Sequence, residues 1–389
     1  MMTPKELPNR ADLVDYNYAV AGHAGTLCDP DGELFIKPCT QTEIEFYQSA
    51  IEEHPAFADL MPVFMGSLLL NDATDITSID EQLPVVAEHI SAEMKEQVIE
   101  LMTEKSQTIE AQAAATEIKV VDNVTWIPNK GKKIVTDTAV VLENAAFGFR
   151  RPNILDVKLG KRLWADDAPL EKKRRFDKIT AETTHRDLGF RIAGMRVYKG
   201  AEDPAELDEE DYRIYDKDYG RVHVHNGNIV DAFRKFIFNP TAGIDTEIGR
   251  AVADAFRRDL ERVRDILEKE ESRMYSSSLL FVFEGDGAAL RAAVDDASGS
   301  AAASAIREKE EPGRATLRVD SGIDMGEDGE IILSTDIEED SEDEREEPRI
   351  YTLKLIDFAH AQWTPGMGPD ENTLAGVRSL IDIFEELTK

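Results

Sequence analysis

Hydrophobic and polar residues follow two different periods along this chain of 389 residues. Residues 18–37 carry short apolar groups between glycines, which predicts hairpin strands ending at Lys37, and β-branched and aromatic residues predict further strands over 134–142 and 349–356. An apolar residue at every third or fourth position instead predicts a helix. Helices are expected over 43–51, 84–118 and 373–387 and after Gly249, where Phe256, Leu260, Val263 and Leu267 form one apolar stripe.

The strand that ends at Lys37 is followed by a helix that carries glutamates. The spacing places Ile44, Tyr47 and Ile51 on one helical face and leaves Glu43 and Glu45 free to point elsewhere. A strand with a lysine, followed by a helix with a glutamate, is typical of the small lobe of kinases. A surface lysine and solvated glutamates would produce the same pattern.

The composition allows a sizeable core but disfavours most anionic partners. With 42 % apolar and 32 % charged residues, the length suits two or three domains. Acidic residues number 78 against 45 basic ones, a net charge of −33 that repels phosphate at long range. We therefore expect no direct binding of nucleic acid, and an anionic ligand would need a local basic pocket.

Cysteine content and hydropathy indicate the compartment. Cys28 and Cys39 are too few for a disulfide framework and are expected to be reduced thiols. No run of 18 apolar residues exists, and the N-terminal sequence lacks the apolar region of a signal peptide. We therefore expect a soluble intracellular protein with no transmembrane segment.

One long stretch differs in composition from the rest of the chain. Residues 286–348 are rich in Ala, Ser, Gly, Asp and Glu, and the twelve residues Asp336–Glu347 include nine acids and one arginine. Such a density of like charge cannot bury a core by itself. The sequence predicts that 286–348 is an acidic, mostly flexible insertion.

The densest basic stretch lies between Lys158 and Lys178, with eight cations among four acids. Just before it, alternation along a strand puts Asp156 and Lys158 on the same face, two residues apart. A carboxylate for hydroxyls and an ammonium for phosphates suit a phosphorylated polyol. A solvated helix face would also explain the basic stretch.

A second candidate site lies at the end of the strand predicted over 349–356. Asp357 follows this strand directly and is itself followed by Phe358 and a small residue. This order is similar to the Asp-Phe-Gly segment of protein kinases, whose carboxylate holds Mg²⁺ on the nucleotide phosphates. An aspartate that only caps a buried strand would give the same sequence.

Four motifs in order resemble those of the inositol polyphosphate kinase family. The first is Pro152-x-x-x-Asp156-x-Lys158-x-Gly160, and the others lie at 189–198, 275–285 and 356–360. Together they span most of the chain outside its insertions. The segments 158–168 and 188–191 look most like the fungal multikinase branch of this family.

The resemblance implies an α+β fold of two lobes, related to the ATP-grasp and protein-kinase folds, with an inositol-binding helical insertion. The N-lobe would comprise 1–142, with a helical insertion at 84–118, and the hinge would comprise 143–149. The C-lobe would comprise 150–389, including the inositol-binding segment 158–186.

The resemblance also implies roles for individual residues. Lys37 would hold the α- and β-phosphates of ATP, Asp156 would reach the ribose, and Asp357 would bind Mg²⁺. Lys158 would lie between the transferred phosphate and the inositol, so Lys158 and Asp357 are the expected catalytic residues. The remaining expected contacts are Glu143 and Ala145 with adenine, and Lys172, Arg175, Lys178 and His360 with the substrate; a shift of one residue would exchange Arg174 and Arg175.

The function implied is an ATP- and Mg²⁺-dependent inositol polyphosphate multikinase acting on hydroxyls of inositol tris- and tetrakisphosphates. One alternative is a pyrophosphate-forming inositol hexakisphosphate kinase. Another is a nuclear scaffold that binds basic transcription-related proteins through the acidic insertion. A nuclear and cytoplasmic location is expected.

Overall fold

The computed structural model describes residues 13–16, 20, 25–69, 136, 138–296 and 349–389. The chain folds into two compact units. Unit 1 comprises Met1–Asn144 and Phe358–Ala361, and unit 2 comprises Ala145–Asp357 and Gln362–Lys389. The helix predicted over 84–118 and most of the predicted acidic insertion lie outside the described residues.

Unit 1 contains a five-stranded antiparallel sheet in the order β1-β2-β3-β5-β4. Apolar residues of its two central strands, such as Ile36 and Val141, are fully buried. Helices α1 and α2 also belong to this unit. The bounds are β1 Val14–Asp15, β2 Leu27–Cys28, β3 Leu34–Pro38, β4 Phe64–Leu69, β5 Thr138–Glu143, α1 Gln41–Glu53 and α2 Pro55–Ala58.

Helix α1 buries a different face from the one that the apolar spacing predicts. Ile44 and Tyr47 are buried as expected, but Ile51 is 49 % exposed. Glu43 is only 1 % exposed and belongs to the buried face. The prediction for Ile51 and Glu43 was wrong because a spacing argument that counts only apolar residues misses an acid that has a buried partner.

An aromatic cluster joins α1 and α2 to the short segment from near the end of the chain. The Phe358 ring, which is fully buried, has its centroid 5.1 Å from Phe46, 5.3 Å from Tyr47 and 6.1 Å from Phe57. Aromatic pairs at these separations are stabilising beyond the area that they bury. The core of unit 1 therefore depends on residues that are distant in sequence.

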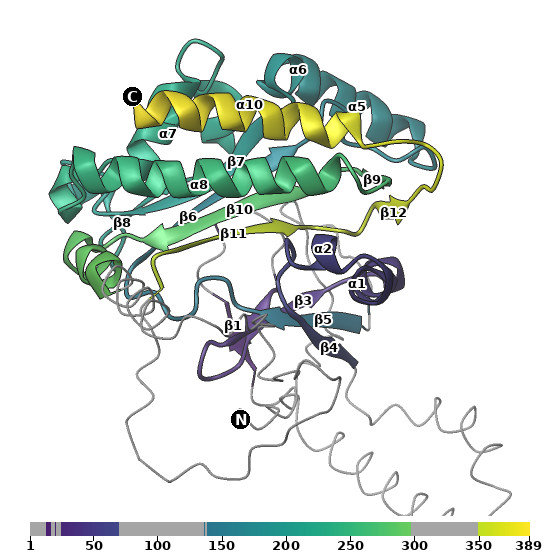
Figure 1. Cartoon of the computed structure of the whole chain (residues 1–389), viewed down its shortest axis with the longest axis horizontal. Coiled ribbons are helices and arrows are strands. Elements are labelled where there is room, and N and C mark those ends of the chain that lie inside the picture. Colours follow the sequence, from purple (N-terminus) through teal and green to yellow (C-terminus); the bar gives the residue numbers. More distant parts are fainter. Residues whose placement is uncertain (1–12, 17–19, 21–24, 70–135, 137, 297–348) are drawn as a thin grey trace, which may run out of the picture. The chain divides into compact units, whose positions relative to one another are not determined.

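Unit 2 is built on a second antiparallel sheet, in the order β11-β10-β6-β7-β8. Figure 1 shows α8 and α10 lying side by side along this sheet. The bounds are β6 Pro152–Leu159, β7 Phe190–Tyr198, β8 Tyr212–Tyr215, β9 Ser272–Met274, β10 Ser278–Glu284, β11 Tyr351–Ile356, β12 Ala361–Trp363, α5 Leu170–Ala181, α6 His185–Leu188, α7 Ile229–Ile237, α8 Thr246–Leu267, α10 Glu371–Thr388, η3 Pro204–Glu206, η4 Tyr219–His223 and η5 Pro240–Ala242.

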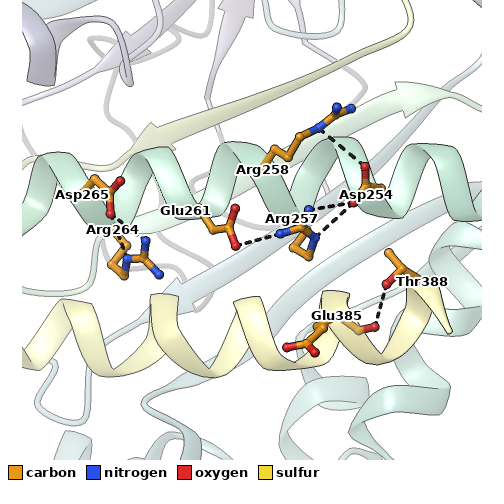
Figure 2. Close-up of polar contacts among 8 residues, drawn as sticks. All are labelled: Asp254, Arg257, Arg258, Glu261, Arg264, Asp265, Glu385 and Thr388. Carbon is orange, nitrogen blue, oxygen red and sulfur yellow. Dashed lines mark hydrogen bonds and ion pairs between the residues drawn. The ribbon is translucent and has the colours of Figure 1, made fainter.

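Helix α8 has one buried and one charged face. Its four predicted stripe residues are all buried, and the Phe256 ring packs 5.2 Å from Phe281 and 5.7 Å from Phe384. The Asp245 side chain caps the first turn by accepting two backbone N–H groups. Figure 2 shows the charged face, where side chains one turn apart form ion pairs, Arg257 with Asp254 and Glu261 and Arg258 with Asp254, and where the neighbouring residues Arg264 and Asp265 form another.

The beginning of the predicted acidic insertion is ordered. Residues 287–296 are helical, and Leu290 and Ala293 of this helix are buried. The prediction that flexibility begins at residue 286 was therefore wrong. Its alanines were interpreted as low-complexity sequence, although alanine is the best helix former.

Both cysteines are free thiols, and Cys39 is buried. Burial raises the pKa of the Cys39 thiol to about 11, and the neighbouring Glu43 carboxylate contributes to the increase. Among the described residues, no helix is long and apolar enough to cross a membrane.

Candidate active site

Strand β6 brings Asp156 and Lys158 to one face of the sheet in unit 2. It pairs with β7 on one side and β10 on the other, and this register puts Lys158 opposite both Arg191 and Ser278. The pairing with β7 is irregular between Asp156 and Val157. A local irregularity of this kind is common next to active sites, where it re-aims a side chain.

The Lys158 ammonium is held by two oxygens. It donates a hydrogen bond of 2.6 Å to the Ser276 carbonyl and lies 3.7 Å from the Asp357 carboxylate. Ser276 and Asp357 both have left-handed backbones, with φ of 64° and 70°. Non-glycine residues in this region are strained and cluster at functional sites. The structure thus brings together the two residues predicted to be catalytic.

Asp156 lies beside this pair and is 5 % exposed. Burial raises the pKa of its carboxyl, as does the charge of Asp357, while Lys158 and Arg191 oppose the increase. No hydrogen bond to the Asp156 Oδ1 atom is present within the described part of the chain. Asp156 therefore offers a buried acceptor next to two cations.

The residues around Asp357 suit one kind of metal site. Mg²⁺ is usually held by one or two carboxylates together with substrate phosphates and waters. Asp357 and Asp156 interact electrostatically, whereas the described residues contain no group of three or more His, Cys, Asp or Glu that could hold a metal by itself. The donors fit a divalent ion that arrives with a phosphorylated ligand. The role of Asp357 as a metal ligand stays a prediction.

Two residues of unit 1 form a buried ion pair. The Lys37 ammonium lies 2.8 Å from the Glu43 carboxylate, and the side chains are 11 % and 1 % exposed. The same carboxylate oxygen accepts a hydrogen bond of 3.2 Å from the Phe358 backbone N–H. A strand with a lysine followed by a helix with glutamates is the pattern typical of kinases, but the pattern alone did not identify Glu43, six positions after Lys37, as the partner of that lysine.

The predicted adenine-reading residues lie where the two units meet along the chain. Unit 1 ends at Asn144, and unit 2 begins at Ala145. The Glu143 N–H donates to the Val63 carbonyl, at 2.9 Å, so it belongs to the sheet. The Asn144 amide nitrogen donates to the Gly32 carbonyl, at 2.7 Å. Adenine binding by Glu143 and Ala145, and the hinge over 143–149, stay predictions.

Helix α5 carries three of the predicted substrate contacts. Lys172 is half-buried, and burial together with Arg175 lowers the pKa of its ammonium. Arg175 and Lys178 are exposed, and Lys178 lies 3.9 Å from Glu182. The fourth predicted contact, His360, is exposed and belongs to unit 1. These substrate roles remain predictions.

Arg191 is a residue of this site that the motif analysis left without a role. It is 4 % exposed and lies opposite Lys158 in the sheet. Burial and the neighbouring Arg221 lower the pKa of its guanidinium to about 10. Like charges directly opposite each other on a sheet are destabilising, so this pair favours an anion nearby. Asp156 supplies part of that negative charge.

The family model described as inositol polyphosphate kinase matches residues 139–385. The chain belongs to the inositol polyphosphate kinase family. It is 31 % identical to the inositol polyphosphate multikinase of Saccharomyces cerevisiae, over 94 % of this chain and 96 % of that protein. It is 23 % identical to the multikinase of Schizosaccharomyces pombe, over 96 % and 97 % of the two chains.

A solved structure also resembles this one. It is the crystal structure of inositol phosphate multikinase Ipk2 from S. cerevisiae in complex with ADP and Mn²⁺, with a TM-score of 0.56 and 26 % identity, covering 92 % of this chain and all of that one. This match confirms the predicted α+β two-lobe kinase-like fold. Family membership confirms that the chain is a kinase.

Proposed function

We propose that this inositol polyphosphate kinase transfers the γ-phosphate of ATP, with Mg²⁺, to hydroxyls of inositol tris- and tetrakisphosphates. The observation that carries the proposal is the group formed by Asp156 and Lys158 on β6 with Asp357, which directly follows β11 in unit 2. Support comes from the S. cerevisiae multikinase, which matches this chain over nearly its whole length. Further support comes from the similar structure of S. cerevisiae inositol phosphate multikinase Ipk2 in complex with ADP and Mn²⁺.

Lys158 has the central role in this proposal. Phosphoryl transfer passes through a loose transition state, so the protein mainly positions the reactants and neutralises charge. An ammonium held at 2.6 Å by the Ser276 carbonyl is pre-oriented toward the oxygens of the transferred group. The acceptor hydroxyl loses its proton late, so no strong base is required. A divalent ion bound at Asp357 would supply further charge neutralisation.

Two side chains are proposed to contact the nucleotide. In unit 1, Lys37 binds the α- and β-phosphates, and Glu43 orients its ammonium. In unit 2, Asp156 accepts a hydrogen bond from the ribose, which supplies a partner for its buried Oδ1 atom.

The substrate is assigned to helix α5 and His360. Lys172, Arg175 and Lys178 supply a local basic surface on a molecule whose net charge is −33. Each charge-assisted hydrogen bond to a phosphate contributes about 1.5–3 kcal/mol. Three such contacts are sufficient to select a compact polyanion over a neutral sugar.

Product analysis tests the proposal directly. The protein is incubated with ATP, Mg²⁺ and inositol 1,4,5-trisphosphate, and we expect tetrakis- and pentakisphosphates. Lys158→Ala should lower kcat at least about a hundredfold, which is about 2.7 kcal/mol of transition-state stabilisation. The control is Lys269→Ala, because Lys269 is exposed and is not among the residues assigned to the site. Turnover by Lys158→Ala above a tenth of the wild-type rate would contradict the proposal.

Inositol hexakisphosphate kinase activity is the second candidate. Rat inositol hexakisphosphate kinase 1 is 28 % identical over 64 % of this chain but only 51 % of its own length. A product that contains a diphosphate would favour this alternative.

We also propose a nuclear and cytoplasmic location, and basic transcription-related partners for the acidic residues within 286–348. The charge density of Asp336–Glu347 supports the second part. Imaging of a fluorescent fusion tests the location. Retention of basic nuclear proteins by the wild type, but not by a variant with these acids changed to amides, tests the partners.

A further inference from the structure

The loop that leaves β6 is held by a side chain from the opposite end of the unit's sequence. The Arg162 backbone N–H donates to the Asn372 Oδ1 atom at 2.8 Å, and the Asn372 Nδ2 atom donates to the Arg162 carbonyl at 3.0 Å. One amide thus satisfies both backbone groups of Arg162, as a neighbouring strand would. Asn372 lies in the first turn of α10.

The approach of this side chain is close. Gly160 has a φ of 98°, and a Cβ atom at this position would lie 2.6 Å from the Asn372 Nδ2 atom. The Gly160 N–H also donates to the Gly189 carbonyl, at 2.7 Å. A glycine is therefore required both by the backbone conformation and by the space that Asn372 occupies.

The same turn of α10 holds a second segment next to Lys158. The Met274 N–H donates to the Asp370 carboxylate at 2.8 Å, and Thr373 donates its hydroxyl to that carboxylate at 2.9 Å. Asp370 and Thr373 are 2 % and 0 % exposed. Met274 precedes Ser276 by two residues, and the Ser276 carbonyl is the acceptor for the Lys158 ammonium.

These contacts form a closed circuit around Lys158. The Ser276 hydroxyl donates to the Leu163 carbonyl at 2.9 Å, which joins the segment anchored by Asp370 to the loop anchored by Asn372. Lys158 precedes Gly160 by two residues, and its ammonium binds the Ser276 carbonyl. The first turn of α10 therefore fixes both the loop that follows Lys158 and the segment that Lys158 binds. A shift of either anchor would move the Lys158 ammonium or the loop that follows it.

The loop in turn connects to helix α5. The Arg162 guanidinium lies 3.8 Å from the centre of the Trp164 ring, and the Lys173 ammonium lies 4.8 Å from it. The Trp164 indole N–H donates to the Asp177 carboxylate at 2.6 Å. The path from Asn372 therefore continues through Arg162 and Trp164 to the helix that carries the proposed substrate contacts.

We propose that Asn372 is a positioning residue for the inositol phosphate substrate. It holds the backbone of Arg162, and through it the orientation of α5, without itself contacting the substrate. The inference rests on the proposed function. Misplacement of a binding group by about 1 Å can cost up to about a hundredfold in rate. Loss of this anchor should therefore weaken the use of the inositol phosphate and leave the nucleotide unaffected.

The test compares Asn372→Ala with a matched control, Asn228→Ala. Asn228 is also half-buried, and its amide makes the same pair of contacts, accepting from the His225 N–H at 2.8 Å and donating to the His223 carbonyl at 2.9 Å. Each variant thus loses one accepted and one donated hydrogen bond. For Asn372→Ala we expect at least a tenfold rise in KM for inositol 1,4,5-trisphosphate, with KM for ATP within twofold of wild type.

Hydrogen exchange provides a readout besides activity. Peptides that cover 160–166 should exchange faster in Asn372→Ala than in wild type, and those of Asn228→Ala should match the wild type. A second variant, Asn372→Asp, keeps the acceptor for the Arg162 N–H but replaces the donor to the Arg162 carbonyl with a second acceptor, so its exchange over 160–166 and its KM should lie between those of wild type and Asn372→Ala.

Several outcomes would overturn the inference. One is that Asn372→Ala has the same KM as wild type for each substrate, and another is that its KM values for ATP and for the inositol phosphate rise together. Unchanged exchange over 160–166 in Asn372→Ala would also overturn it, as would an Asn372→Asp variant that is as impaired as Asn372→Ala. Failure of the proposed function is distinguishable, because the wild type would then produce no inositol polyphosphate at all. Exchange over 160–166 would still report whether Asn372 anchors the loop.

Discussion

The buried pair of Lys37 and Glu43 allows a sharp test of unit 1. We expect Glu43→Gln to raise KM for ATP while the KM for the inositol substrate changes little. The change keeps an acceptor for the Phe358 N–H, which donates to this carboxylate at 3.2 Å. It removes the charge that holds the Lys37 ammonium at 2.8 Å. The variant therefore isolates the electrostatic contribution of Glu43.

The size of the effect follows from burial. A charge-assisted hydrogen bond contributes about 1.5–3 kcal/mol, which corresponds to about a ten- to hundredfold loss in kcat/KM for ATP if the orientation of Lys37 depends on it. Glu43→Ala should be worse for folding, because breaking a buried ion pair costs about 3–5 kcal/mol in the free energy of unfolding.

The matched control is Glu45→Gln, on the same helix and two residues away. Glu45 is exposed, and exposed substitutions usually change the free energy of unfolding by less than about 0.5 kcal/mol. The assay is steady-state kinetics with each substrate varied in turn, together with urea unfolding of each variant. If Glu43→Gln and Glu45→Gln give the same KM for ATP, Glu43 does not orient Lys37 and the reasoning fails.

Three further results are expected. The pKa of the buried His185 is lowered to about 3, so below about pH 6.5 the unfolded chain binds a proton that the folded chain does not. Stability should fall by up to about 1.4 kcal/mol per pH unit toward pH 3, and urea unfolding at pH 7 and 5 should show a smaller fall in His185→Leu. Phe256→Ala should cost about 3–5 kcal/mol in urea unfolding, against less than about 0.5 kcal/mol for the exposed Val222→Ala. Replacing 297–348 by a short linker should leave kcat within about twofold of wild type, because the entropic cost of loop closure depends only weakly on loop length. Removing 290–345 should instead destabilise the protein, because it deletes buried helical residues. Lost activity in a folded 297–348 deletion would contradict this.

Strand alternation was sufficient to predict that two residues of the candidate site share one face. A period of two put Asp156 and Lys158 on one face, and the sheet register keeps them there. The apolar stripe of α8 was equally predictable, because a repeat of three and four residues specifies a buried helical face. In both cases the information lies within one element.

Contacts between distant segments could not be predicted in this way. Glu43 is buried because Lys37 and the Phe358 N–H are placed beside it, and the spacing of its own helix gives no sign of either. Asn372 follows Arg162 by 210 positions, so its role depends on tertiary packing. The left-handed backbone of Asp357 likewise requires surroundings that hold a strained residue.

The late return of the chain to unit 1 has a consequence for biosynthesis. Phe358 completes the aromatic cluster of Phe46, Tyr47 and Phe57, and it reaches the Glu43 carboxylate across 315 positions. Domains generally fold from the N-terminus as they leave the ribosome. Unit 1 can complete this cluster only when nearly the whole polypeptide has been made. Until then the three aromatic rings lack their contact with Phe358. A nascent chain stopped before residue 358 should therefore be a target for chaperones and proteases.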